Sequence, residues 1–428
     1  MLRCTPRRGT PAPAHPTHQT GPASGSRLAR RSDLILAFGA VLMLAVLLSE
    51  RARRSVLSIS VLFLVAGFAL GRGGLGWFHL QLGDELLQRF TQVALFAILF
   101  SDAALLPVSQ LRQAWRLPGR ALLFGLPLTL GTVAVAGHLL LGLNWLPAVL
   151  LGAVLSPTDP VFIAAILDRE IVPLRLRRLL QVESGLNDGL ALPIVTLMLA
   201  LVGHRDPHPT GVLLESALGI GLGVLVPLLP LHLERRAFFA ASEAYRPLGG
   251  FAIGCVLFGA ASLLHANEFL AAFAGGVTAA SFGPQHASSL RQLGRPVAEI
   301  LKLAALLIFG AVLTLPALLR LGAAGLVFAA VALLVARPLG LVLALLGGGL
   351  PRREWLAAAW FGPKGFASLL YALTIVQAGL PDGQVLFDVS ALVIVISILA
   401  HSSTDVLVAR LFQEREARAV DEELPRST

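Results

Sequence analysis

Charged residues are scarce in this chain: only 14% of its 428 residues are Asp, Glu, Lys or Arg, whereas 56% are hydrophobic. Soluble domains usually carry about 25% charged and 45–50% apolar residues. This scarcity excludes an ordinary soluble globular protein. A helix that crosses a bilayer needs about 20 apolar residues, and the mean hydropathy of +0.77 therefore predicts a polytopic membrane protein whose principal partner is the lipid bilayer.

Cysteine is almost absent. Cys4 and Cys255 are the two cysteines in the sequence, which excludes a disulfide framework and a four-ligand zinc site. We expect no resident cofactor. The net charge of +9 would suggest nucleic acid in a soluble chain, but here the arginines lie in short connections between apolar runs, where they orient a protein in its membrane. We therefore expect no nucleic-acid partner.

Apolar runs of transmembrane length follow a polar tail. Residues 1–31 hold no acidic residue and no apolar period, so we expect a disordered tail, and a start assigned too far upstream is an alternative. The sequence predicts thirteen spans within residues 32–412 and a short cytoplasmic tail over 413–428. The spans are 34–50, 55–71, 88–107, 120–140, 146–167, 178–203, 211–231, 248–265, 267–283, 297–316, 321–348, 354–378 and 386–411.

The distribution of arginine predicts the orientation. The connections after odd-numbered spans, together with the C-terminal tail, hold 21 arginines, whereas the connections after even-numbered spans hold four. Because short cytoplasmic loops carry the excess of positive charge, we expect a cytoplasmic C-terminus and an external N-terminus.

We single out seven charged residues within the predicted spans. A charged side chain at the bilayer centre is unfavourable by roughly 2.5–3.5 kcal/mol on insertion scales, so each one is by default a candidate functional residue. Lys302 lies near the cytoplasmic end of its span, where snorkelling to the interface would explain it. Asp102 either extends an ion site or makes a packing contact. The full set is Asp102, Asp159, Glu183, Asp188, Lys302, Arg337 and Lys364.

Two spans are interrupted near their middle. The fifth contains Ser-Pro-Thr-Asp-Pro over 156–160, and the twelfth contains Phe-Gly-Pro-Lys-Gly over 361–365. Proline removes a backbone donor, and broken helices occur at membrane depth only where they are buried in protein or line a cavity. A simple proline kink would account for the first break but would not require Asp159 beside it.

The position of the breaks predicts an internal symmetry. If spans 1–6 and 8–13 form two six-helix halves, both breaks fall in the fifth helix of a half, as expected for inverted repeats with a site at the midplane. Where two broken helices cross, Asp159 could neutralise positive helix ends and Lys364 negative ones.

The sixth span carries a run of oxygen ligands, Glu-Ser-Gly-Leu-Asn-Asp-Gly over 183–189. A spacing of four residues places Ser184 and Asp188 on one helix face and Glu183 and Asn187 on the adjoining face. Such hard oxygen donors suit a small hard cation, although Asp188 could also simply bind a neighbouring helix. Glu183 needs a buried cation in turn, and Arg337 lies at comparable depth, so we expect these two to pair.

These motifs resemble those of the NhaP/NHE-type monovalent cation:proton antiporters. The resemblance rests on Ser-Pro-Thr-Asp-Pro, on Glu-Ser-Gly-Leu-Asn-Asp-Gly, on the Ala-Arg-Pro-Leu-Gly that contains Arg337 and on the broken span with Lys364, and it extends over about residues 33–412. It implies a mobile core (about 120–203 and 321–411), a dimerisation part (about 34–107 and 211–316), a homodimer and elevator-like alternating access.

The resemblance also implies residue roles. Asp188 would bind the cation or the proton, Ser184 and Thr158 would add oxygen ligands for the transported Na⁺, and Asn187 would support them. Asp159 and Lys364 would stabilise the helix crossing, and Glu183 with Arg337 would form the core salt bridge. Relatives with Asn-Asp in the sixth span are electroneutral, so we expect electroneutral exchange of Na⁺, or of K⁺ or Li⁺, for protons. We expect a plasma membrane location, in bacteria the inner membrane.

Three rival functions follow from the same residues. Asp159 and Asp188 could serve an intramembrane aspartyl protease, although Thr158 and Asn187 precede them instead of the Gly and Tyr expected there. A passive cation channel would not require a carboxylate for which protons compete. A scaffold without transport activity would not require seven charges in the membrane. Antiport explains the pattern best, and it makes the protein a transporter and not an enzyme.

Overall fold

The computed structural model describes residues 24–54, 58–78, 80–109, 112, 116–159, 172–202, 209–234, 238, 242–282, 288 and 290–423, and these contain helices but no strand. The prediction of an all-α architecture is thereby confirmed. Two expected boundaries differ. Helix α1 begins at Ser24, inside the segment expected to be disordered, and α20 continues to Glu423, past the expected start of the tail. Leu, Ala, Arg and Glu are strong helix formers, and they extend both helices beyond the apolar runs.

The helices follow the predicted runs. Their bounds, in chain order, are α1 Ser24–Arg54, α2 Ile59–Leu70, α3 Glu85–Ala103, α5 Arg116–Arg120, η1 Ala121–Gly125, α6 Leu126–Leu141, α7 Trp145–Leu155, α9 Leu174–Val202, α10 Pro209–Leu233, α11 Arg246–Leu263, α12 Glu268–Phe282, η4 Leu290–Gly294, α14 Arg295–Val312, α15 Leu315–Arg320, α16 Gly322–Val331, η5 Ala332–Ala336, α17 Arg337–Leu345, α18 Arg352–Trp360, α19 Phe366–Gln377 and α20 Gly383–Glu423.

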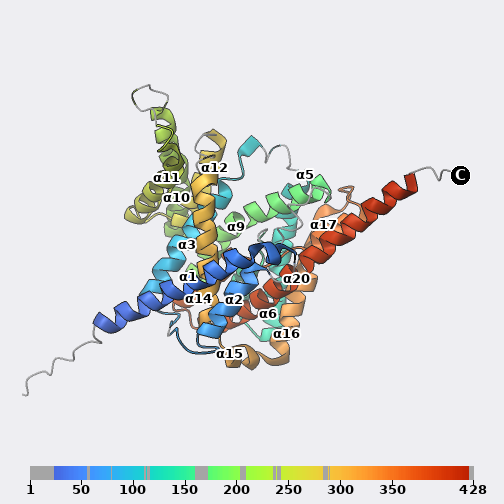
Figure 1. The fold of residues 1–428 in the computed structure, drawn as a ribbon, viewed down its shortest axis with the longest axis horizontal. Coiled ribbons are helices and arrows are strands. Elements are labelled where there is room, and N and C mark those ends of the chain that lie inside the picture. Colours follow the sequence, from blue (N-terminus) through green and yellow to red (C-terminus); the bar gives the residue numbers. More distant parts are fainter. Residues whose placement is uncertain are drawn as a thin grey trace, which may run out of the picture.

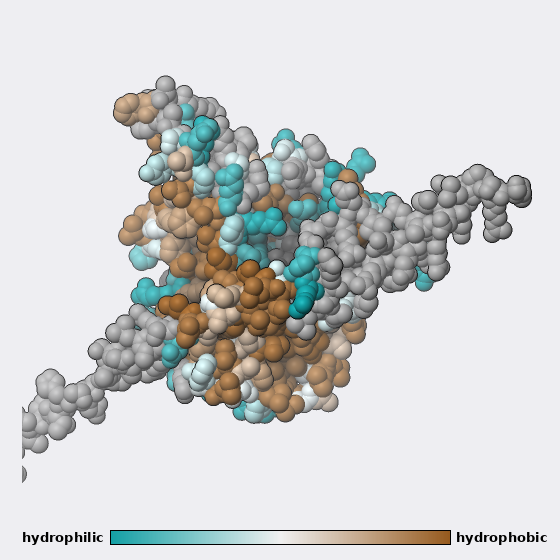
Figure 2. Space-filling view, viewed as in Figure 1, coloured by the Kyte–Doolittle hydropathy of each residue, from teal (hydrophilic) through white to brown (hydrophobic). Residues whose placement is uncertain are grey.

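Seven helical stretches in the described part are long and apolar enough to cross a membrane, and four shorter helices are also apolar. Several long helices leave large apolar side chains on the outside: Leu36 and Leu47 of α1 are each 74% exposed. On the face shown in Figure 2, apolar residues cover broad areas. A lipid environment accounts for such surfaces, since lipid tails solvate apolar side chains as a protein core does. The total of thirteen crossings stays a prediction.

The helices pack in two sets. In one, α2 lies against α14, and α12 contacts α3, α10 and α11. In the other, α6 contacts α7 and α16, and α19 packs on α20. Figure 1 shows the long helices α1 and α20 projecting from opposite sides of the molecule. Helices α3 and α14 of the first set contact α19 of the second, and the charged residues of interest lie near this junction.

Both predicted interruptions are present. Helix α7 ends at Leu155, and residues 157–159 are not helical; the continuation over 160–171 lies outside the described residues. Helix α18 ends at Trp360, and α19 begins at Phe366 after five non-helical residues. Pro157 and Pro363 lie inside these gaps, where their missing backbone N–H groups break the helical hydrogen-bond ladder.

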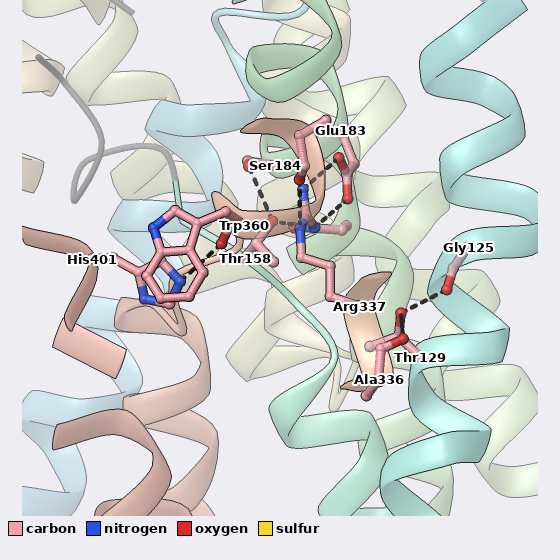
Figure 3. Close-up of polar contacts among 11 residues, drawn as sticks. Gly125, Thr129, Thr158, Glu183, Ser184, Ala336, Arg337, Trp360 and His401 are labelled. Carbon is pink, nitrogen blue, oxygen red and sulfur yellow. Dashed lines mark hydrogen bonds and ion pairs between the residues drawn. The ribbon is translucent and has the colours of Figure 1, made fainter. Parts of the chain in front are cut away.

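Two π-helical turns occupy matching places in the predicted repeats. In the fourth span η1 immediately precedes Leu126-Pro127, and in the eleventh span η5 immediately precedes Arg337-Pro338. A proline removes one helical hydrogen bond, and a local π-turn accommodates the loss. The two turns lie close together: the Thr129 hydroxyl donates to the Gly125 carbonyl at 2.8 Å and approaches the Ala336 carbonyl at 3.4 Å (Figure 3).

Candidate ion-binding site

The two interrupted spans cross and satisfy each other's backbone. The backbone N–H of Asp159 donates to the Pro363 carbonyl at 3.0 Å, and the N–H of Phe366, the first residue of α19, donates to Asp159 Oδ2 at 3.1 Å. An N-terminal helix end carries partial positive charge, which a carboxylate stabilises. Gly365 makes this approach possible, because a Cβ atom there would lie 2.0 Å from Asp159 Cβ. Asp159 thus lies where the sequence places it, at the positive end of a broken helix.

Lys364 is fully buried beside the crossing. Its backbone N–H donates to Ser397 Oγ of α20 at 2.8 Å. Its side-chain Nζ has no hydrogen-bond partner within the described part of the chain, so we find no contact through which it neutralises the negative end of α18.

His401 meets that negative helix end instead. Its Nε2 lies 3.0 Å from the carbonyl of Trp360, the last residue of α18, and its Nδ1 lies 2.8 Å from the Ser397 carbonyl. Its ring packs 5.2 Å from the Trp360 ring (Figure 3). The sequence analysis did not single out His401, although a histidine inside a predicted membrane span is a usable signal.

A group of buried side-chain oxygens lies between the α7 break and α9. Thr158 Oγ1 lies 3.0 Å from Ser184 Oγ and accepts a hydrogen bond from Asn187 Nδ2 at 2.7 Å. These three residues are at most 2% exposed. Asn187 Oδ1 is buried and has no partner among the described residues. Because Thr158 Oγ1 accepts from Asn187 and can donate to Ser184, the Ser184 oxygen keeps one lone pair for a cation.

Asp188 lies on α9 with Ser184 and Asn187, one turn after Ser184, and is 8% exposed. Its backbone carbonyl accepts a hydrogen bond from the Tyr371 hydroxyl of α19 at 3.0 Å. No described residue donates a hydrogen bond to its carboxylate. Tyr371 was not singled out from the sequence, because a tyrosine in an apolar helix usually belongs to the core.

Glu183 and Arg337 pair as the sequence analysis expected. Arg337 Nη1 and Nη2 donate to Glu183 Oε1 and Oε2 at 2.6 and 3.0 Å, and both side chains are buried. The Arg337 Nε donates further to the Ala358 carbonyl at 3.1 Å. Figure 3 shows this pair beside Thr158 and Ser184. Gly362 leaves room for the guanidinium stem, since a Cβ there would lie 2.0 Å from Arg337 Cδ.

The expectation for Lys302 was wrong. Lys302 does not snorkel to the interface: it is 4% exposed, and its Nζ donates to Asp102 Oδ2 at 3.1 Å and to Oδ1 at 3.3 Å. The apolar run around Lys302 gave no information about its partner, because Asp102 lies 200 positions earlier in the chain. Asp102 is therefore held in an ion pair, and within the described chain its carboxylate makes no hydrogen bond to the oxygen-bearing residues of α9.

The donor set fits a hard monovalent cation. Within the described residues no three His, Cys, Asp or Glu side chains converge as they do in a transition-metal site. The grouping consists of one carboxylate, two hydroxyls and an amide, which are hard oxygen ligands. Crossed broken helices beside buried oxygens are the arrangement of a membrane transport fold, and they make the crossing a candidate ion site.

Comparison with known proteins agrees with a membrane transport fold. The transmembrane sodium/hydrogen exchanger family matches residues 38–410, and the chain belongs to this family. It is 24% identical over 386 residues to the K(+)/H(+) antiporter NhaP of Alkalimonas amylolytica, which covers 88% of this chain and 66% of the relative. It is 26% identical over 378 residues to the K(+)/H(+) antiporter NhaP2 of Shewanella sp. (strain MR-4), with 86% and 65% covered. The chain thus spans about two thirds of the length of these curated relatives.

The fold is also that of a solved structure. The sodium proton antiporter MjNhaP1 from Methanocaldococcus jannaschii superposes with a TM-score of 0.73 at 18% identity, covering 90% of this chain and 98% of that one. The predicted family and polytopic fold are therefore confirmed. The family is one of transporters, as predicted.

Proposed function

We propose that the protein is a secondary antiporter that exchanges a monovalent cation for protons at Asp188. One observation carries the proposal: Asp188 is a buried carboxylate that no described residue hydrogen-bonds, and it follows a helical turn in which the Ser184 hydroxyl and the Asn187 amide nitrogen contact Thr158 of the broken span. A carboxylate at membrane depth requires a counter-ion or a proton. Either a monovalent cation or a proton can therefore neutralise the charge of Asp188.

The mechanism requires only competition. A bare carboxylate does not cross the hydrocarbon barrier, so the core moves when Asp188 holds a proton or one cation. Ser184 Oγ and the Asn187 oxygen, which is buried without a partner in the described chain, supply further ligands. Thr158 orients both through its hydroxyl. Because one carboxylate accepts one charge of either kind, the exchange is electroneutral.

The ion and the assembly are also part of this proposal. Na⁺ is the first candidate, with K⁺ and Li⁺ as alternatives. The similar proteins include both a K⁺/H⁺ antiporter and a sodium/proton antiporter. Residues 34–107 and 211–316 form a dimerisation part of a homodimer, against which residues 120–203 and 321–411 move. The protein resides in the plasma membrane, in bacteria the inner membrane, with its C-terminus in the cytoplasm and its N-terminus outside.

The rival functions receive no support. An aspartyl protease needs both carboxylates at one reacting centre, but the Asp159 carboxylate binds the N-terminus of α19. The family match is to exchangers and not to channels.

Reconstitution in liposomes with an internal pH-sensitive dye tests the proposal. Na⁺, K⁺ or Li⁺ is added against an imposed pH difference, with wild type and Asp188→Asn in parallel. We expect the transported cation to dissipate the pH difference through wild type only, independently of a voltage clamped with valinomycin when Na⁺ or Li⁺ is the cation. Wild-type rates from folded Asp188→Asn, or no exchange with any cation, would overturn the proposal.

A further inference from the structure

A buried ammonium group lies beside the proposed ion site. Lys302 projects from α14 toward α3, where both oxygens of the Asp102 carboxylate accept its hydrogen bonds. The lysine side chain is 5% exposed, whereas that of Asp102 is 30% exposed. The carboxylate therefore keeps an open side, and the ammonium is enclosed by protein.

The same ammonium group also contacts the other set of helices. Lys302 Nζ lies 5.7 Å from the ring centroid of Phe366, a distance typical of a cation–π contact. Phe366 begins α19, and its N–H binds Asp159. Lys302 thus joins α3 and α14, in the proposed dimerisation part, to the helix end at the crossing in the proposed mobile part.

The charge of Lys302 reaches the proposed transport residue. Asp188 interacts electrostatically with Asp159, Asp102 and Lys302. Lys302 in turn interacts with Asp102, Asp159 and Glu299. In a weakly screened interior such interactions between unit charges extend over several ångströms. A lysine ammonium is itself a monovalent cation, so it opposes the entry of a second cation and cancels the attraction that Asp102 would otherwise exert.

We propose that Lys302 is a positioning residue that sets the affinity for the transported cation, acting as a tethered cation that neutralises Asp102 beside the site. This inference rests on the proposed antiport at Asp188. It requires no contact between Lys302 and the ion. It predicts opposite effects for the two partners: loss of the Lys302 charge strengthens cation binding, and loss of the Asp102 charge weakens it.

The experiment measures the cation dependence of exchange in liposomes for wild type, Lys302→Gln and Asp102→Asn. We expect the apparent KM for the cation to fall about tenfold in Lys302→Gln and to rise about tenfold in Asp102→Asn, the size expected when one nearby unit charge is removed. Lys302→Arg keeps the charge and should keep the wild-type KM. Cation-dependent thermal stabilisation of each variant in detergent reports the same shifts without transport.

Two controls separate this role from a structural one. Arg89→Gln breaks an exposed ion pair with Glu85 on the same helix α3 and should leave KM unchanged. A purely structural Asp102–Lys302 pair would lower the maximal rate and the melting temperature in both single variants without moving KM, and that result would overturn the inference. If Lys302→Gln does not fold, Asp102→Asn decides by whether its KM rises. Wild-type exchange with unchanged KM in the variants refutes this inference alone, whereas absence of wild-type exchange refutes the antiport proposal beneath it.

Discussion

Arg337 and Glu183 form a buried, bidentate ion pair that joins α17 to α9. The Nη1–Oε1 distance is 2.6 Å and the Nη2–Oε2 distance is 3.0 Å. Glu183 immediately precedes Ser184, whose hydroxyl contacts that of Thr158. The ion pair therefore fixes the turn of α9 that carries the proposed ligands against α17 and, through the Ala358 carbonyl, against α18, which ends at the second break. Breaking such a pair leaves an uncompensated buried charge, while replacing both partners does not.

From this we expect Arg337→Leu or Glu183→Leu alone to destabilise the protein by ~3–5 kcal/mol. The double variant, which leaves no buried charge, should recover most of that loss. Thermal unfolding in detergent measures all three. Equal losses in the single and double variants would show that the pair contributes by packing and not by charge.

Gly365 should tolerate no side chain. A Cβ there would lie 2.0 Å from Asp159 Cβ, so Gly365→Ala must push the two broken spans apart. We expect it to abolish cation/proton exchange in liposomes. Gly131 is the matched control, since it lies in α6 with no atom within 4 Å of an added Cβ. Gly131→Ala should retain wild-type exchange and gain up to ~1 kcal/mol of stability, because alanine favours a helix more than glycine does.

Thr158→Val should weaken cation binding. The substitution preserves the shape of the side chain but removes the oxygen that accepts from Asn187 Nδ2 and contacts Ser184. An unpaired buried amide is unfavourable by ~1–3 kcal/mol, so we expect the apparent KM to rise with little change in the maximal rate. Thr158→Ser, which keeps the hydroxyl, should bind the cation as wild type does. The concentration dependence of the initial rate distinguishes the two.

His401→Leu should destabilise the second break. It removes the ring nitrogen that lies 3.0 Å from the part-buried Trp360 carbonyl at the end of α18, which then keeps only the hydrogen bond from the Gly362 N–H at 2.8 Å. We expect a loss of ~0.5–1.5 kcal/mol in the free energy of unfolding, the net contribution of one hydrogen bond, measured by thermal denaturation in detergent. His401→Gln, whose amide can still donate, should lose less. If both variants unfold like wild type, the contact does not stabilise the break.

The sequence predicted the helical architecture, the two breaks and the Glu183–Arg337 pair because each has a local cause. Low charge demands bilayer helices, and Pro157 and Pro363 interrupt them where a continuous hydrogen-bond ladder is impossible. A buried glutamate in an apolar run needs a buried cation, and few were available.

The surroundings of Lys302, Lys364 and His401 were decided only by the tertiary structure. Lys302 pairs with Asp102, and His401 meets the end of α18, in both cases across long stretches of chain. A position in an apolar run shows that a charge lies at membrane depth, but the rotation and packing of neighbouring helices decide which group faces it. Composition and local spacing thus determined what kind of protein this chain forms, and helix packing decided how its charges are satisfied.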